Sequence, residues 1–116
     1  MNNYKELKVW QKSIDLAVNV YELTKLFPQN EIYGLTSQIR RSANSIAANI
    51  AEGSARTSKK EFSYFLSISL GSAFELETHL TIASKINLVT TERLNELLSL
   101  IAEIEKMIRG LQKFNK

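Results

Sequence analysis

The sequence predicts an all-α protein that folds as a single antiparallel up-down-up-down four-helix bundle over residues 1–116. Apolar residues recur every three or four positions along most of the chain, as they do on one face of an α-helix. The chain has one proline and four glycines, so long segments contain no helix breaker. Four such segments follow one another with short connections, and short connections favour antiparallel neighbours.

The first two helices are expected over residues 7–27 and 32–52. The apolar stripe of the first helix comprises Leu7, Trp10, Ile14, Ala17 and Tyr21. Pro28 ends this helix because proline cannot continue the hydrogen-bond ladder. The stripe of the second helix comprises Ile32, Leu35, Ile39, Ala43, Ile46 and Ile50. Gly53 follows at a position where a left-handed residue is favoured, and we expect it to end the helix.

The last two helices are expected over residues 58–86 and 91–114. Ser58 and Glu61 have the spacing of a capping box, in which each side chain accepts a free backbone N–H bond of the first turn. Thr90 is the expected N-cap of the last helix. The stripe of the third helix comprises Phe62, Leu66, Ser69, Ala73, Leu76, Leu80 and Ala83. The stripe of the fourth comprises Leu94, Leu97, Ile101, Ile104, Ile108 and Leu111.

The third helix carries a second stripe on its opposite side. A helix that is apolar on two opposite faces is normally buried on both. Within one bundle the outer face would be exposed to solvent. An exposed apolar face usually needs a partner, so the pattern predicts self-association through this face. The alternative is a scatter of surface apolar residues, which is common in monomers. The second stripe comprises Tyr64, Ile68, Gly71, Glu75, Thr78 and Ile82.

Polar residues flank the small-residue segment SIAANIAEG, which spans residues 45–53. Small side chains let a neighbouring helix approach closely, and a buried polar group there must be hydrogen-bonded. We expect Arg41, Asn49, Glu52 and Ser72 to form a polar network between the second and third helices. Two alternatives stay open: Arg41 and Glu52 are merely solvated, or these polar residues have a ligand-binding or catalytic role.

Basic residues concentrate at one end of the predicted bundle. The up-down-up-down topology brings together residues 1–15, 49–64 and 103–116, which hold ten basic and six acidic residues, a net charge of +4. Such a field attracts polyanions such as RNA or DNA. The alternative is that these residues keep the surface soluble and offset helix dipoles. The candidate contacts are Lys5, Lys8, Lys12, Arg56, Lys59, Lys60, Lys106, Arg109, Lys113 and Lys116.

No catalytic, cofactor or metal site is expected. The chain has no cysteine, and its one histidine, His79, lacks the partner residues of a dyad or a di-iron motif. We interpret His79 as a structural or surface histidine, and Trp10, Tyr21 and Phe27 as core aromatics rather than base-stacking residues. The N-terminus lacks the apolar core of a secretory signal, and no segment is long and apolar enough to span a membrane. A cytoplasmic protein is expected.

Three segments resemble a known family. They are YKELKVWQKSIDLA, YGLTSQIRRSANSIAANIAEGSAR and KEFSYFLSISLGSAFELET, and together they extend over most of the chain. They resemble the four-helix-bundle family named after the 23S rRNA intervening-sequence proteins. The resemblance implies a homopentamer. The family includes the accessory variability determinant of diversity-generating retroelements, which binds nucleic acid and a reverse transcriptase, and which is more basic than this chain.

Two functions are therefore considered. The first is a non-catalytic homo-oligomeric scaffold, a pentamer if the resemblance holds, whose basic end binds RNA, DNA or a nucleic-acid-processing protein. The second is a protein–protein interaction ring with no nucleic-acid role. An enzyme would need a nucleophile–base pair or a metal cluster, and the sequence shows neither.

Overall fold

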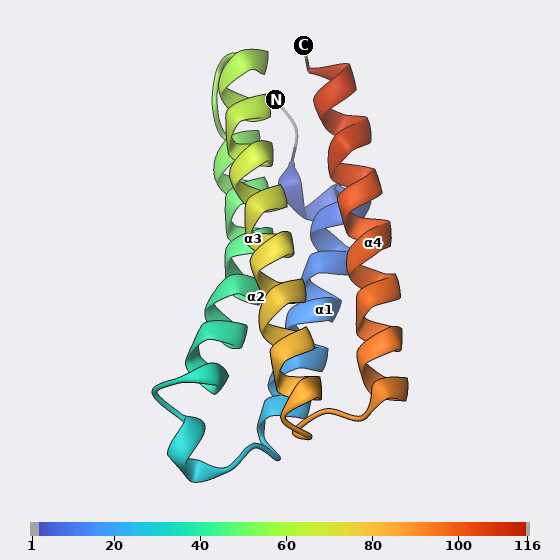
Figure 1. The fold of residues 1–116 in the computed structure, drawn as a ribbon. Helices are drawn as coiled ribbons and strands as arrows, with labels where there is room; N and C mark the ends of the chain where they lie inside the picture. The colour runs from blue at the N-terminus through green and yellow to red at the C-terminus, as the bar shows by residue number, and fades with distance from the viewer. Residues whose placement is uncertain (1–2, 116) are drawn as a thin grey trace.

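The computed structural model describes residues 3–115 and confirms the all-α four-helix bundle. In order along the chain, the elements are η1 (Tyr4–Glu6), α1 (Lys8–Thr24), η2 (Gln29–Glu31), α2 (Leu35–Ser54), α3 (Lys59–Lys85) and α4 (Thr91–Phe114). The described residues form an elongated body of 43 × 24 × 20 Å (Figure 1). None of these helices has a segment long and apolar enough to cross a membrane.

Each helix packs against the next, and α1 also packs against α4. The α2–α3 pair has the most extensive contact. Figure 1 shows η1, the α2–α3 connection and the end of α4 toward one end of the bundle, and η2 and the α3–α4 connection at the other. The topology is therefore the predicted one, and it gathers the three basic segments at one end.

Gly53 does not end the second helix, so this expectation was wrong. It lies inside α2, is buried, and has no positive φ. A Cβ added at Gly53 would lie 2.7 Å from Cβ of Phe65 and 2.9 Å from Cδ1 of Phe62. Real Cβ atoms do not approach other atoms this closely, so the glycine allows α3 to lie against the end of α2. Its role is close packing rather than a turn.

The caps agree with the sequence at the start of α4 and partly at the start of α3. Thr90 Oγ1 accepts a bond from Arg93 N at 3.1 Å. Ser58 Oγ accepts from Glu61 N at 3.1 Å, but the Ser58 hydroxyl then donates to the Glu61 carboxylate, so the carboxylate does not cap a backbone N–H. A cap not anticipated from the sequence is Asn87, which ends α3 with φ 67°. This left-handed residue lets Leu88 N donate to Ala83 O at 2.8 Å.

The core stripe of α1 differs from the expected one. The buried positions of α1 are Val9, Ser13, Leu16, Val20 and Thr24. Leu7, Trp10 and Ala17 pack beside the core, but Ile14 and Tyr21 are 37% and 38% exposed, so the interpretation of Tyr21 as a core aromatic was wrong. Ser13 and Thr24 tolerate burial because their hydroxyls donate to the carbonyls of Val9 and Val20, at 2.7 and 2.8 Å.

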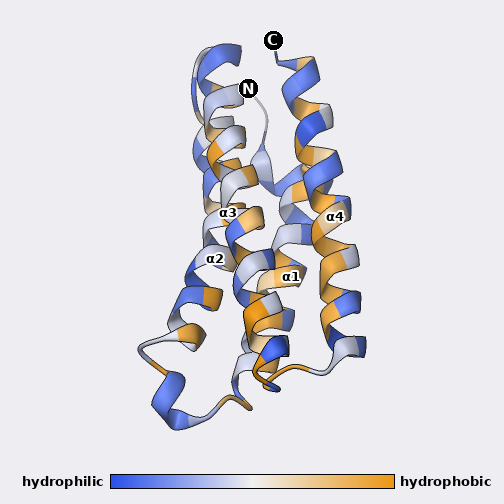
Figure 2. Cartoon of the chain, in the orientation of Figure 1, coloured by the Kyte–Doolittle hydropathy of each residue, from blue (hydrophilic) through white to orange (hydrophobic). Residues whose placement is uncertain are grey.

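The core stripes of α3 and α4 are as predicted. All seven expected positions of α3 are buried, and so are the first five of α4, with Leu111 half-buried. In α2, Ile39, Ala43, Ile46 and Ile50 are buried, whereas Ile32 precedes the helix and is exposed. Figure 2 shows hydrophobic residues recurring along all four helices. These stripes converge on one central core.

Candidate nucleic-acid interface and oligomer face

The small residues of α2 lie against α3 and leave room for direct polar contacts between the two helices. The Ser69 hydroxyl of α3 donates to the carbonyl of Ile46 in α2 at 2.8 Å, and both residues are fully buried. A hydroxyl so close to a neighbouring backbone requires short side chains around it, which the alanines and serines of both helices supply. The contact fixes how far α3 can slide along α2.

A second polar contact joins the helices through Ser45. Ser45 Oγ lies 2.9 Å from Ser72 Oγ and 2.9 Å from Asn49 Nδ2, which also donates to the Ser45 carbonyl at 2.9 Å. Asn49 and Ser72 thus belong to one network, with Ser45 as its central residue. Sequence analysis missed Ser45, although its i, i+4 spacing from Asn49 was a usable signal.

Glu52 and Arg41 are not part of this network. Glu52 is exposed and pairs with Arg56 one turn further on, and the Arg56 guanidinium lies 4.7 Å from the centroid of the Phe65 ring. Arg41 is exposed and has no hydrogen bond or ion pair within residues 3–115. Both side chains are exposed, and neither contacts Asn49 or Ser72, so the expectation that they join the network was wrong.

The outer face of α3 is open to solvent in the single chain. We define this face by the second predicted stripe: Tyr64, Ile68, Gly71, Glu75, Thr78 and Ile82. All six residues are exposed, and Phe74 beside them is 43% exposed. A Cβ added at Gly71 would have no neighbour within 4 Å. The bundle itself therefore leaves this face uncovered from Tyr64 to Ile82, with Tyr64, Ile68 and Ile82 as its apolar side chains. That a second copy covers this face remains a prediction.

The ten predicted nucleic-acid contacts lie on segments that meet at one end of the bundle, except that Lys116 lies outside the described residues. We call this the basic end. Figure 2 shows strongly hydrophilic residues at the start of α3 and at the end of α4. Seven of these side chains are exposed: Lys5, Lys8, Lys59, Lys60, Lys106, Arg109 and Lys113.

The other two, Lys12 and Arg56, are half-buried and already have acidic partners. Lys12 Nζ lies 3.3 Å from Glu103 Oε1, which connects α1 with α4, and Arg56 pairs with Glu52. Arg109 is close to an aromatic ring, with its guanidinium 5.9 Å from the centroid of Phe74. Structural contacts thus occupy part of the predicted basic surface, and the exposed lysines form the rest.

Two carboxyl groups meet between α3 and α4, which sequence analysis did not anticipate. Glu105 Oε2 is buried without a hydrogen-bond donor, and the Glu77 carboxyl lies beside it. The pKa of Glu105 is raised to about 7, mainly by burial and then by the hydrogen bond to Glu77 and the negative charge of Glu77, against an opposing effect of Arg109. A bond between two carboxyls needs one proton, so Glu105 is protonated over much of the acidic range.

His79 lies among polar side chains, and Trp10 packs against the core. His79 is half-buried in a polar cleft of about 120 Å³ beside Arg41, Ser45 and Glu75. Trp10 packs against the core and meets Tyr4 edge-to-face, with ring centroids 5.2 Å apart. Within residues 3–115, no group of three or more His, Cys, Asp or Glu side chains is arranged to hold a metal ion.

Residues 5–110 match the protein family described as 23S rRNA-intervening sequence protein. This chain belongs to that family. A crystal structure from Bacteroides thetaiotaomicron VPI-5482, described as a protein with unknown function from the S23 ribosomal protein family, has 31% sequence identity to it and a TM-score of 0.83. The likeness covers 90% of this chain and 98% of that protein. No curated protein matches the chain.

Proposed function

We propose that this chain is the protomer of a non-catalytic homo-oligomeric scaffold, a pentamer by family resemblance, which binds RNA, DNA or a nucleic-acid-processing protein at its basic end. The observation that supports assembly is the outer face of α3. Opposite the core stripe, the side chains of Tyr64, Ile68 and Ile82 are 63%, 36% and 46% exposed in the single chain. Such a patch is typical of a surface that a partner covers.

Assembly is tested by light scattering at micromolar concentration. The scaffold should have several times the chain mass of 13.2 kDa. A stable monomer of uniform mass would contradict the proposal, because no second copy would then cover the outer face of α3.

Charge supports the nucleic-acid part of the proposal. The exposed Lys59 and Lys60 at the start of α3 and Lys113 at the end of α4 have no ion pair within residues 3–115, so they remain able to contact phosphates. Repetition of this end around an oligomer would multiply its field. Contacts of this kind act on the backbone and release counterions, so the affinity for a random RNA should fall linearly on a log–log plot against salt.

A protein–protein interaction ring is the second candidate. Its supporting observation is that Lys12 and Arg56 already pair with Glu103 and Glu52, which reduces the free positive charge at the basic end. An oligomer that binds neither RNA nor DNA at about 50 mM salt, where electrostatic attraction is strong, would favour this candidate over the first.

A further inference from the structure

An apolar hollow opens toward the basic end, between the start of α1 and the C-terminal turns of α4 (Figure 1). It has a volume of about 200 Å³ and is lined by Leu7, Lys8, Val9, Met107 and Leu111. Leu7, Met107 and Leu111 are half-buried, so their side chains are partly accessible from outside. The lining is apolar apart from one lysine and contains no carboxylate. The hollow is therefore suited to an apolar group that belongs to an anionic ligand.

The size of the hollow limits what it accepts. A cavity of about 150 Å³ holds a benzene ring, whereas pockets for drug-sized ligands have roughly 300–1,000 Å³. At about 200 Å³, the hollow has room for one aromatic ring system but not for a large cofactor. The acyl chain of a lipid would project from it into water. A heterocyclic base fits this size, and in a nucleic acid it is part of a polyanion.

Phe114 adds an exposed aromatic ring one helical turn beyond Leu111. Phe114 is 84% exposed, although phenylalanine is among the residue types most often buried. Residues three and four positions apart are neighbours on a helix surface, so Phe114 lies beside Gly110 and Leu111, which in turn neighbour Met107. A Cβ added at Gly110 would have no neighbour within 4 Å. The surface of α4 is therefore open between the hollow and the Phe114 ring.

Lysines without an acidic partner lie around the hollow and the ring. Four of them are exposed and have no ion pair within residues 3–115: Lys5, Lys8, Lys106 and Lys113. Two come from the start of the chain and two from α4, so the helices on both sides of the hollow supply cations. Among the acidic residues of these segments, Glu6 is exposed and Glu103 already pairs with Lys12. The phosphates of a bound strand would therefore meet cations from both helices.

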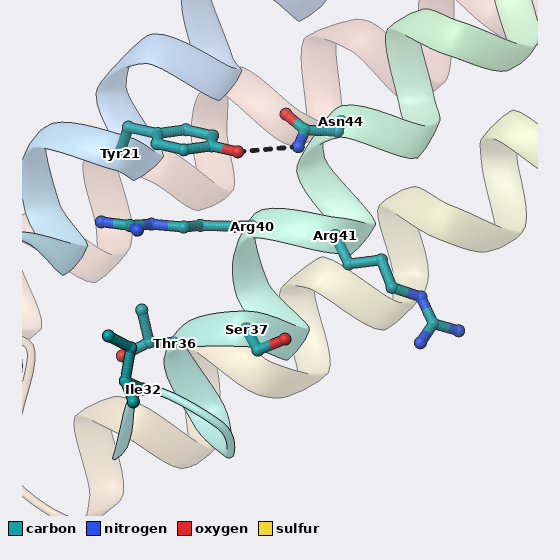
Figure 3. Close-up of a pocket in the computed structure, with 7 residues that line it drawn as sticks. All are labelled: Tyr21, Ile32, Thr36, Ser37, Arg40, Arg41 and Asn44. Atoms are coloured by element: carbon teal, nitrogen blue, oxygen red, sulfur yellow. Dashed lines mark hydrogen bonds between the residues drawn. The ribbon is translucent and has the colours of Figure 1, made fainter. Parts of the chain in front are cut away.

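The groove between α1 and α2 at the opposite end is larger, at about 380 Å³, and most of its lining residues are polar. Figure 3 shows that their polar atoms point to different places: the Tyr21 hydroxyl bonds to Asn44, the Arg40 guanidinium points the opposite way, and Arg41 extends away from both. No set of donors there converges on one ligand. The hollow at the basic end does not depend on such a set, because apolar contact with a ring needs no aligned donors.

We propose that the hollow and the Phe114 ring bind unpaired bases of a single-stranded nucleic acid, while the surrounding lysines bind its phosphates. One base enters the hollow and a nearby base stacks on Phe114, since every base has a flat face that can stack on an aromatic ring. The bases of a duplex are paired and stacked on one another, so they cannot enter the hollow. This inference rests on the proposed binding of nucleic acid at the basic end, and it specifies which form of nucleic acid is bound.

The test is fluorescence anisotropy of the full chain with a labelled, unstructured RNA of about 20 nucleotides, which is longer than one typical single-strand site. The same RNA as a duplex and inorganic polyphosphate serve as competitors, at about 50 mM salt. Charge alone favours the duplex, because its charge density is higher. The single strand should nevertheless bind at least about tenfold more tightly than the duplex or polyphosphate, because only its bases are free to stack.

The possible failures are distinguishable. If the duplex or polyphosphate bound as tightly as the single strand, the inference about unpaired bases would be overturned, whereas the proposed binding of nucleic acid would stand. If none of the three polyanions bound, this inference and the nucleic-acid part of the proposed function would both be overturned.

Phe114 has a matched control at the opposite end of the bundle. Phe114→Ala should weaken single-strand binding at least about fivefold and leave duplex binding unchanged, because it removes a stacking surface and no charge. Phe114→Trp should retain single-strand binding. Tyr33→Ala removes an aromatic ring that is 97% exposed next to η2, and should change single-strand affinity by less than about twofold. Equal losses from Phe114→Ala and Tyr33→Ala would overturn the proposal.

Met107→Gln tests the hollow itself. The change keeps length and charge but places an amide in the hollow, which a base must desolvate on entry, so single-strand affinity should fall at least about threefold. Leu100→Gln is the control, since Leu100 is also half-buried on α4 but does not line the hollow, and it should leave single-strand affinity unchanged. Melting temperatures of both variants show that each is folded. If Met107→Gln kept full affinity, or if both variants lost it equally, the hollow would not hold a base and the proposal would be overturned.

Discussion

At the scale of single residues, the close α2–α3 contact depends on the absence of a side chain at Gly53. Gly53 has no Cβ at a point where the atoms of Phe62 and Phe65 leave no space for one. Gly71 and Gly110 have open space around the same position. Glycine is therefore needed for helix packing at position 53, whereas Gly71 and Gly110 have no packing role within the single bundle.

Gly53→Ala should destabilise the fold by about 1–3 kcal/mol, because the added methyl forces α2 and α3 apart. Denaturant unfolding would measure this. Gly110→Ala is the matched control: it lies in an exposed part of α4 and should stabilise by up to about 1 kcal/mol through helix propensity. If both variants were equally stable, the close approach at Gly53 would not limit the packing of these helices.

The Ser45 network leads to unequal effects at two neighbouring polar residues. Asn49→Ala should cost about 1–2 kcal/mol because the bonds of its amide to Ser45 are lost. Glu52→Ala should cost less than about 0.5 kcal/mol because only an exposed ion pair with Arg56 disappears. Equal shifts of the denaturant midpoints would show that the network does not distinguish these residues.

At the scale of the helices, sequence periodicity predicted α3 and α4 well because their core positions are almost all apolar. It failed on α1, where the core includes Ser13 and Thr24 and the large residues flank it. A hydropathy pattern cannot foresee this, since those hydroxyls become tolerable only through bonds to their own helix. The Glu77–Glu105 pair was missed because it depends on side chains from two helices, and so does the bond between Ser45 and Ser72, although the spacing of Ser45 from Asn49 on α2 was visible in the sequence.

The α3–α4 carboxyl pair makes stability depend on pH. The Glu105 pKa is about 7 in the folded chain and near 4.5 when unfolded, so the folded state binds the extra proton between these values. This stabilisation is complete at pH values below the unfolded pKa and is lost as the pH rises through about 7. Stability should therefore fall between about pH 5 and pH 8, by about 1 kcal/mol after allowance for solvent screening.

Glu105→Gln should abolish that decrease and raise stability at about pH 8, because the amide is neutral at every pH and can still donate to Glu77. Melting temperatures across the pH range would measure the difference. Glu103→Gln is a control on the same helix, where the carboxylate is exposed and pairs with Lys12. An unchanged pH profile in Glu105→Gln would assign the dependence to other groups.

At the scale of the whole molecule, the outer face of α3 determines whether the bundle is an independent unit. Ile68→Glu should dissociate or unfold the assembly, because it places a charge in a desolvated contact. Leu26→Glu makes the same kind of change at a residue that is 85% exposed outside α3, and should leave the mass unchanged. Light scattering on both variants would contradict the proposed face if Ile68→Glu kept the mass of the unmodified protein.

The basic end allows a matched comparison of charge reversal at the two ends of the bundle. Lys60→Glu with Lys113→Glu changes the charge of each chain by four at the basic end, and both side chains are exposed. Lys25→Glu with Lys85→Glu makes the same change at the opposite end. Arg109 is left intact because it lies beside Phe74 and lowers the Glu105 pKa, so its reversal would perturb the carboxyl pair.

If phosphates bind at the basic end, the first pair should greatly reduce affinity for a random RNA and flatten its dependence on salt. Each lost phosphate contact removes about one unit from the log–log slope. The second pair should retain the slope and lose only the weaker long-range attraction, because its charges lie farther from the bound strand than the screening length of about 10 Å at 0.1 M salt. Equal losses from both pairs would show that net charge alone attracts the RNA, and that the topology which gathers these lysines creates no defined site.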